Sequence, residues 1–329
     1  MTPATPAPQA APAGYDRAVL RQVAEAAGQA PSLHNSQPWR FRLRDGAIEV
    51  LADTSRQLAV ADRTGWAVRI ACGAATFNAR LALAMRGTPA HVAWRPSDSD
   101  PDVLARLTPG TPRPPTYLER DLFAAIPRRH SNRRPFWPDP VPSATRARLI
   151  EAAKLEGCWL DLLVGMVPLS GFAQIASSAD RVLRRNFGYQ AEMAAWVHTD
   201  GAPDGVPVSA GGPIPEPHDL LPQRSFGDRR RGPGRDFEPE PLVAILGTHA
   251  DRAIDHLTAG QALQRVLLTI TDSGLTSSMI SQPIEVPAAR DQLRQSLRRT
   301  GIPQMALRIG YGDPGRSAPR RDVDELLAD

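Results

Sequence analysis

Two apolar segments of equal length constrain the possible fold most strongly. Residues 73–87 and 260–274 both begin and end with glycine, fourteen positions apart, and both have the apolar content of a buried helix. An Asp-Arg pair precedes each segment (Asp62-Arg63 and Asp251-Arg252), and a strand-like stretch follows each one. We interpret this repeat as a diverged duplication in which each copy has one long central helix. Two unrelated core helices of similar length are the alternative interpretation.

Local patterns around the first segment predict helices and strands in alternation. Apolar residues recur at helical spacing over 15–28, where Gly28 ends the pattern. Asp45-Gly46 separates two alternating stretches in "WRFRLRDGAIEVL", which predicts a tight hairpin. Further along we expect a long helix over 66–86, a strand at 91–94, a stiff proline-rich connector at 109–115 and a short helix near Leu118.

Similar patterns surround the second segment. We expect helices over 144–155, 253–273 and 287–299, further helical turns up to about 198, and strands at 158–164, 242–248, 275–281 and 304–311. The apolar run 159–169 is expected to be a buried strand. Between the helical turns that end at about 198 and the strand at 242–248, residues 199–241 are dense in Gly, Pro and charge and show no periodicity. A loop of this length inside a compact domain indicates a lid or a disordered insert.

The charge of the chain does not indicate a nucleic-acid partner. The 329 residues carry 39 basic and 35 acidic side chains, a net charge of only +4, and show no basic stripe with interleaved aromatic residues. Lys154 is the single lysine, so nearly all positive charge is arginine. Because the planar guanidinium makes two-point contacts with phosphate, we expect an anionic small-molecule ligand instead.

Other features exclude several further classes. Cys72 and Cys158 lie far apart, which argues against a disulfide framework and the common zinc patterns. We expect 1–14 to be a flexible Pro/Ala-rich tail rather than a signal peptide, no stretch to span a membrane, and the protein to be soluble and cytoplasmic. His34 and the other histidines lack partners at metal-ligand spacing, so no metal site is expected.

Two polar stretches remain as candidate binding elements. "PSLHNSQPWRF", which begins at Pro31, places many side-chain donors and acceptors between a helix and a strand. "RRHSNRR", residues 128–134, brings arginines together with Ser131 and Asn132, donors that suit a phosphate dianion. A further Arg pair, Arg320-Arg321, lies near the end of the sequence. No nucleophile, metal or nucleotide motif accompanies them, which indicates that a bound cofactor performs the chemistry.

Together these stretches resemble the nitroreductase family of flavin enzymes. In that family a Pro-Ser-Asn loop lines the flavin ring and an Arg-Ser loop binds the FMN phosphate and ribityl chain, each loop coming from a different subunit of a homodimer. Typical members have the Arg-Ser loop first, whereas here the Pro-Ser-Asn loop comes first. The chain is similar to the Acg-type subgroup, in which two such subunits are fused and one complete site remains under a long lid.

The resemblance implies a fold and a domain organisation. It implies an α+β, three-layer α/β/α architecture, in which the nitroreductase-like fold occurs twice with mostly antiparallel sheets, long central helices and a lid insert. The expected parts are the tail 1–14, an N-terminal half at 15–116 and a C-terminal half at 117–329 that contains the insert at about 199–241. Such an internal pseudo-dimer is expected to be a monomer or a weak homodimer.

The resemblance also implies the cofactor and its ligands. FMN is the expected cofactor, bound by Arg129, Ser131, Arg133, Pro31, Ser32, Asn35, Gln37, Met279, Ser281, Gln282 and Arg320, with Arg321 as the alternative to Arg320. At the ring-face segment typical members have Pro, Glu and Gly, which this chain lacks. The resemblance implies an FMN-dependent oxidoreductase that acts on a small molecule, with NAD(P)H as a candidate reductant. Because the Glu is missing, a non-catalytic FMN-sequestering protein is the alternative. Trp39 is assigned to the core.

Overall fold

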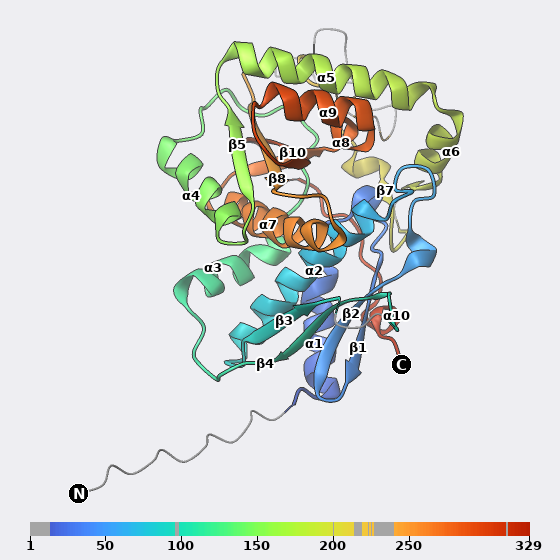
Figure 1. Cartoon of the computed structure of the whole chain (residues 1–329), viewed down its shortest axis with the longest axis vertical. Coiled ribbons are helices and arrows are strands. Elements are labelled where there is room, and N and C mark those ends of the chain that lie inside the picture. The colour runs from blue at the N-terminus through green and yellow to red at the C-terminus, as the bar shows by residue number, and fades with distance from the viewer. Residues whose placement is uncertain are drawn as a thin grey trace, which may run out of the picture.

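The computed structural model describes residues 14–95, 99–199, 201–213, 219–222, 224, 226, 240–313 and 315–329 (Figure 1). The expected tail therefore lies almost entirely outside the described residues, as does part of the insert. None of the helices in the described ranges combines the length and the apolar character needed to cross a bilayer.

The N-terminal half is a four-stranded antiparallel sheet covered by two helices. The Asp16 carboxylate accepts the Val19 N–H at 2.8 Å and begins the first helix. Asp45 and Gly46 have φ angles of 51° and 69°, the left-handed turn expected for a two-residue hairpin. The elements are α1 (Arg17–Gly28), β1 (Trp39–Arg44), β2 (Ala47–Ala52), α2 (Trp66–Met85), β3 (Ala90–Trp94) and β4 (Val103–Pro109), with the strand order β1-β2-β4-β3.

The C-terminal half has a second antiparallel sheet of the same kind. Its strand order is β5-β8-β10-β9, so the first, second, fourth and third strands follow one another as in the first sheet. Its main strands are β5 (Trp159–Leu163), β8 (Leu242–Thr248), β9 (Thr276–Ile280) and β10 (Ile302–Gly310), with the short β6 (Val197–His198) and β7 (Val206–Pro207). Its helices are α3 (Tyr117–Ala125), α4 (Ser143–Lys154), α5 (Met166–Arg185), α6 (Phe187–Ala195), α7 (Ala253–Asp272), α8 (Gln282–Glu285), α9 (Pro287–Ser296) and α10 (Val323–Leu326).

The two long helices α2 and α7 lie side by side at the centre of the molecule (Figure 1). They meet at Gly73 and Gly260, where a β-carbon on Gly73 would stand 2.1 Å from the Leu257 carbonyl oxygen and one on Gly260 would stand 2.1 Å from that of Ile70. Each oxygen lies three residues before the opposite glycine, so the contact is reciprocal. The expected α+β fold with central helices is confirmed, whereas an origin by duplication stays a prediction.

Two sequence-based expectations were wrong or incomplete. The run 159–169 is not one strand, because β5 ends at Leu163 and α5 begins at Met166. Gly165, with a φ angle of 87°, separates the two elements, and Val167 is exposed. Because the run is almost entirely apolar, its sequence gives no sign of the boundary between β5 and α5. Strand β4 was not expected, since its alternating residues follow a polar, aspartate-rich stretch and lead into the proline-rich connector.

The final described segment returns to the N-terminal half. Helix α10 packs on α1, and the backbone N–H of Ala328 donates to the Phe41 carbonyl at 2.8 Å. Arg21 on α1 forms an ion pair with Asp324. Figure 1 shows α10 and the C-terminus beside β1, away from the second sheet. This path carries the residues around Arg320 alongside the Pro-Ser-Asn loop.

Candidate functional site

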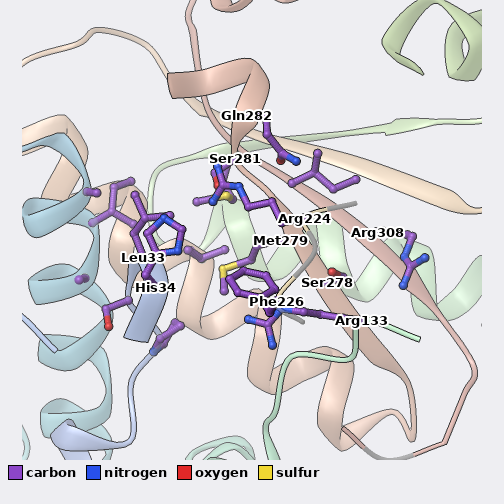
Figure 2. Close-up of a pocket in the computed structure, with 18 of the residues that line it drawn as sticks. Leu33, His34, Arg133, Arg224, Phe226, Ser278, Met279, Ser281, Gln282 and Arg308 are labelled. Atoms are coloured by element: carbon purple, nitrogen blue, oxygen red, sulfur yellow. The ribbon is translucent and has the colours of Figure 1, made fainter. Parts of the chain in front are cut away.

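Two adjoining cavities open where the two halves meet. The large cavity lies between the start of α2 and strand β9 (Figure 2). The arginine cavity is bounded by the Pro-Ser-Asn loop, by the loop around Arg129 and by the segment around Arg320. Pro31, Ser32, Arg133 and Met279 line both cavities, so the two spaces form one continuous site.

Most of the residues expected to bind the cofactor line these cavities, although they come from distant parts of the sequence. The arginine cavity contains Asn35, Arg129, Ser131 and Arg320, and the large cavity contains Ser281 and Gln282, in addition to the four shared residues. The structure thus brings together the Pro-Ser-Asn loop of the N-terminal half and the Arg-Ser loop of the C-terminal half. Their role in binding stays a prediction.

The Pro-Ser-Asn loop adopts an uncommon backbone conformation. His34, Asn35 and Gln37 have φ angles of 52°, 56° and 51°, in the left-handed region that non-glycine residues rarely occupy. The Ser32 hydroxyl accepts the Gln37 N–H at 2.9 Å and stabilises the turn. Such strain concentrates at functional sites, where the surrounding structure enforces it.

Gln37 and Arg321 do not line either cavity. The Gln37 side chain is fully buried, accepts the Arg321 backbone N–H at 2.9 Å and donates to the Pro203 carbonyl at 3.0 Å. The Arg321 guanidinium lies near Asp53, at 3.5 Å, and near Glu325, at 3.3 Å. Both residues connect the loop to the final segment on the side that faces away from the two cavities. Of the two alternatives, Arg320 is therefore the one that faces the arginine cavity.

The Arg-Ser loop is held against the edge of β9. Ser131 forms a parallel bridge with Ser277, and the Asn132 N–H donates to the Ser277 carbonyl at 2.8 Å. The Asn132 side chain also donates to the Asp313 carbonyl at 2.8 Å. Arg308 on β10 stacks on Phe136, with its guanidinium carbon 4.0 Å from the ring centroid, and donates to the Arg134 carbonyl at 2.8 Å. These contacts fix where the arginines of the loop point.

The arginine cavity holds positive charge that no described acidic side chain pairs with. Burial and the nearby Arg320 lower the pKa of Arg129 to about 9, and burial lowers the pKa of Arg320 to about 10. Neither side chain forms an ion pair with a carboxylate in the part of the chain that the structure describes. The Nε atoms of both arginines are buried and have no hydrogen-bond partner among the described residues. An anion placed between them would supply the missing partner and relieve their mutual repulsion.

Arg133 stands at the junction of the two cavities. Its guanidinium lies over the Phe226 ring, 4.6 Å from the centroid, and donates to the Ala210 carbonyl at 3.1 Å. Burial and the neighbouring Arg224 lower the pKa of Arg133 to about 10. In addition to Arg129 and Arg320, it therefore places a third positive group close to the boundary between the arginine cavity and the large cavity.

Described residues of the insert form part of the wall of the large cavity. Leu221, Pro222, Arg224 and Phe226 line it opposite strand β9. Figure 2 shows Phe226 close to Met279, with His34 and Leu33 on the side of the N-terminal half. Burial lowers the pKa of His34 well below its usual value, and Arg224 and Arg133 lower it further, so that His34 is neutral at pH 7.

Sequence reasoning missed several cavity residues. Trp66 begins α2 and lines the large cavity, but at a helix start it gives the same signal as a core residue. Arg224 and Phe226 lie in the aperiodic insert, where no pattern indicates which side chain turns inward. Arg316 of the arginine cavity could have been suspected, because it lies four residues before Arg320. Among the described residues, no group of three or more His, Cys, Asp or Glu side chains could hold a metal ion.

Comparison with known proteins places the chain among relatives of similar length, although no family model matches it. It is 32% identical over 324 residues to the Mycobacterium tuberculosis protein named "Putative NAD(P)H nitroreductase Rv3131". The aligned region covers 95% of this chain and 92% of that protein. The chain belongs to the nitroreductase family. Another member, the M. tuberculosis protein named "Putative NAD(P)H nitroreductase acg", is 28% identical over 94% of this chain and 95% of its own length.

Solved nitroreductases match part of the chain. A Bacteroides fragilis nitroreductase with bound FMN is 12% identical and covers 61% of this chain and 93% of its own, with a TM-score of 0.38. The FMN-dependent nitroreductase NfnB from Mycobacterium smegmatis, in complex with NADPH, is 16% identical and covers 63% of this chain and 97% of its own, with a TM-score of 0.39. The resemblance of the sequence to the nitroreductase family and its Acg-type members is confirmed by the relatives.

Proposed function

We propose that this oxidoreductase of the nitroreductase family depends on FMN and transfers hydride or electrons to a small-molecule substrate. The observation that carries the proposal is the pair Arg129 and Arg320, two buried cations that pair with no carboxylate among the described residues and lie next to the large cavity. A ligand with a phosphate at one end and a flat apolar ring at the other matches both spaces. FMN has this form, and it supplies hydride and electron transfer when it is bound.

The residues present fit such a cofactor. Arg129, Arg320 and Ser131 would hold the phosphate by charge-assisted hydrogen bonds, and the two unpartnered Nε atoms supply donors for it. Met279 and Ile280 offer an apolar wall for the ring, while Ser32, Asn35, Ser281 and Gln282 provide hydroxyl and amide groups around it.

The protein's own side chains would orient the reactants and stabilise charge. Arg133 lines both cavities and can stabilise negative charge that develops beside the large cavity. His34 is neutral at pH 7 and adds no charge there. Leu221 and Phe226 of the insert exclude water from the space opposite Met279. This arrangement needs no side-chain nucleophile, which agrees with the absence of a nucleophile motif from the sequence.

We further propose that one site forms per chain and that each half contributes one side. The Pro-Ser-Asn loop and Arg129 lie in different halves, but hydrogen bonds join the halves at the site. Arg320 Nη1 donates to the Asn35 side-chain oxygen at 3.0 Å, and Arg129 donates to the Gln29 carbonyl at 3.3 Å. The predicted halves at 15–116 and 117–329 therefore act as the two subunits of a fused pseudo-dimer. The names of the relatives favour NAD(P)H as the reductant.

The alternative function is FMN sequestration without turnover. Four described insert residues line the large cavity, which supports a protein that encloses and retains its cofactor. Steady-state NAD(P)H oxidation with nitroaromatic, quinone and enone acceptors separates the two functions. Turnover with any acceptor supports the enzyme, whereas tight FMN retention without turnover supports sequestration.

The cofactor proposal is tested with Arg129→Ala. We expect at least a tenfold weaker affinity for FMN, because a charged hydrogen bond contributes about 1.5–3 kcal/mol. Isothermal titration of cofactor-free protein with FMN measures the effect. Arg128→Ala is the matched control, since Arg128 is exposed and donates to the Ala124 carbonyl. Equal affinities for the two variants would contradict the assignment.

A further inference from the structure

Trp66 at the start of α2 contributes an aromatic side chain to the wall of the large cavity, and its polar edge is held by the other half of the chain. Its indole Nε1–H donates to the side-chain oxygen of Gln304 at 2.8 Å. Both side chains are buried, with Trp66 7% and Gln304 0% exposed. Gln304 lies on β10, so this hydrogen bond joins the two halves beside the cavity. A buried indole N–H needs such a partner, and the bond fixes the direction of the ring.

An irregularity in β10 places Gln304 at this point. The register of β10 against β8 shifts between Pro303 and Met305, which leaves Gln304 as an extra residue, as in a β-bulge. A bulge changes the direction of a side chain, and bulges are frequent next to active sites. Met305, the following residue, lines the large cavity itself. The irregularity therefore lies directly beside the cavity wall that Trp66 helps to form.

Further hydrogen bonds fix the orientation of the Gln304 carboxamide. Its nitrogen donates to the Asp251 carboxylate at 3.0 Å and to the Thr248 hydroxyl at 2.9 Å. Arg290 on α9 donates to the Gln304 oxygen at 2.9 Å and forms an ion pair with Asp251. The amide nitrogen thus faces two acceptors, and the amide oxygen faces two donors, Arg290 and Trp66. A rotation of the amide by a half-turn would place donor against donor, so the oxygen stays directed at the indole.

A second series of contacts returns from Asp251 to α2. His256 Nε2 lies 2.8 Å from Asp251 Oδ1, and Arg69 Nε donates to His256 Nδ1 at 3.1 Å. Since a guanidinium can only donate, Nδ1 accepts and the ring proton lies on Nε2, toward the carboxylate. Burial lowers the pKa of His256 despite the opposing effect of Asp251, which agrees with a neutral ring. Arg69 follows Trp66 by three positions, so both ends of this hydrogen-bonded network attach to one turn of α2.

We propose that Gln304 is a positioning residue, which holds the Trp66 indole in place as an aromatic wall for a flat ring bound in the large cavity. Trp66 is the largest side chain that α2 contributes to this wall, alongside Ala67, Ile70 and Ala71. Contact between two aromatic rings depends on the angle between them, so a fixed indole binds such a ligand better than a mobile one. The ligand part of the proposal rests on the proposed function, whereas the contact between Gln304 and Trp66 does not.

The indole N–H of Trp66 tests this hold without any cofactor. In protein with isotope-labelled tryptophan, NMR follows the six indole groups, and Trp66→Phe identifies the signal that belongs to Trp66. Gln304→Met keeps the length of the side chain but removes the amide oxygen. We expect the Trp66 Nε1–H to exchange with deuterium at least ~10-fold faster in Q304M than in the wild type, because its acceptor is lost.

The matched control is Gln264→Met. Gln264 on α7 is equally buried and donates to the Asn78 side-chain oxygen of α2 at 2.8 Å, but it lines neither cavity. We expect Q264M to lower the melting temperature without accelerating the exchange of the Trp66 N–H. Unchanged exchange in Q304M, or the same acceleration in Q264M, would overturn the proposal.

Affinity for FMN tests whether Gln304 acts through Trp66. Trp66→Phe and Q304M should each weaken the binding of FMN to the cofactor-free protein by at least ~3-fold, measured by isothermal titration. Phenylalanine has no N–H for Gln304, so Q304M should cause no further loss in the Trp66→Phe background. Equal losses from Q304M in both backgrounds, or no loss from Trp66→Phe, would overturn the contact with the ligand. If the wild type itself binds no FMN, the proposed function fails, while the exchange result still decides whether Gln304 holds Trp66.

Discussion

Strained backbone and uncompensated charge meet at a few residues in the site. The left-handed conformations of His34, Asn35 and Gln37 each cost on the order of 1–3 kcal/mol. Hydrogen bonds from Ser32 and the final segment hold the loop in this shape. The conformation places the Asn35 carboxamide against Arg320 and turns Gln37 away from the cavity. Single residues in this loop therefore have separate tasks despite their proximity.

The pair Arg320 and Arg321 tests this division of tasks. Arg320→Ala should weaken FMN binding by at least about tenfold, since it removes a guanidinium from the arginine cavity. Arg321→Ala should change FMN affinity little, because Arg321 contacts Asp53 and Glu325 instead. Fluorescence titration of FMN into both cofactor-free variants measures the affinities. A larger loss in the Arg321 variant would assign the phosphate contact to the other arginine.

His34 should make the folded protein sensitive to mild acid. Burial, Arg224 and Arg133 lower the pKa of His34 in the folded state, whereas the unfolded residue titrates near 6.5. The unfolded chain therefore binds a proton first as the pH falls, so this stability is complete above pH 6.5 and is lost below it. Between pH 7.5 and 5.5 the loss reaches about 1.4 kcal/mol.

His34→Asn isolates this contribution, because asparagine tolerates the φ angle of 52°. Urea denaturation of the cofactor-free proteins at both pH values gives the free energy of unfolding. We expect the wild type to lose about 1.4 kcal/mol more than the Asn variant between pH 7.5 and 5.5. Identical pH dependence in the two proteins would show that the pKa of His34 is the same in the folded and unfolded states.

Single-residue chemistry could be predicted from sequence only where polar side chains are concentrated in short stretches. Ser131, Arg133 and Asn35 stand in such stretches and do line the cavities. Phe226 could not be predicted, because an isolated aromatic residue in an aperiodic insert gives no indication of its direction. The choice between Arg320 and Arg321 needed the path of the backbone, which a doublet of identical residues cannot reveal.

At the scale of helices and strands, glycine placement explains both the successes and the failure. Gly46 and Gly87, with φ angles of 69° and 78°, end elements where the sequence predicted ends. Gly165, at 87°, also ends an element, but it lies inside an apolar run and was interpreted as part of a strand. Periodicity identifies the elements with one buried face, whereas a strand and a helix joined within one apolar run have no periodic boundary.

The crossing of α2 and α7 should be intolerant of any side chain. Gly73→Ala should lower the free energy of unfolding by about 3 kcal/mol, because the new β-carbon would meet backbone atoms that cannot move independently. Gly171→Ala on α5 is the control, since no atom lies within 4 Å of its β-carbon position. There we expect a gain of up to about 1 kcal/mol from helix propensity. Chemical denaturation of both variants measures the difference, and equal effects would argue against close contact at the crossing.

At the scale of the whole molecule, two similar halves enclose one unequal site. The strand orders correspond, but the Pro-Ser-Asn loop occurs in the first half and the Arg-Ser loop in the second. We therefore expect a single FMN per chain. Absorbance of the flavin released by denaturation, divided by the protein concentration, measures the ratio. Two flavins per chain, or none in a folded sample supplied with FMN, would contradict a single shared site.

The reciprocal contact between Gly73 and Gly260 also bears on how such a chain can evolve. A larger residue at either position could not be compensated by a smaller one at the other, because both are already glycine. Both positions are therefore restricted to glycine, although loops and surface residues elsewhere in the two halves can change. Selection at this one crossing would keep glycine at both positions while the loops and surface residues of the two halves change.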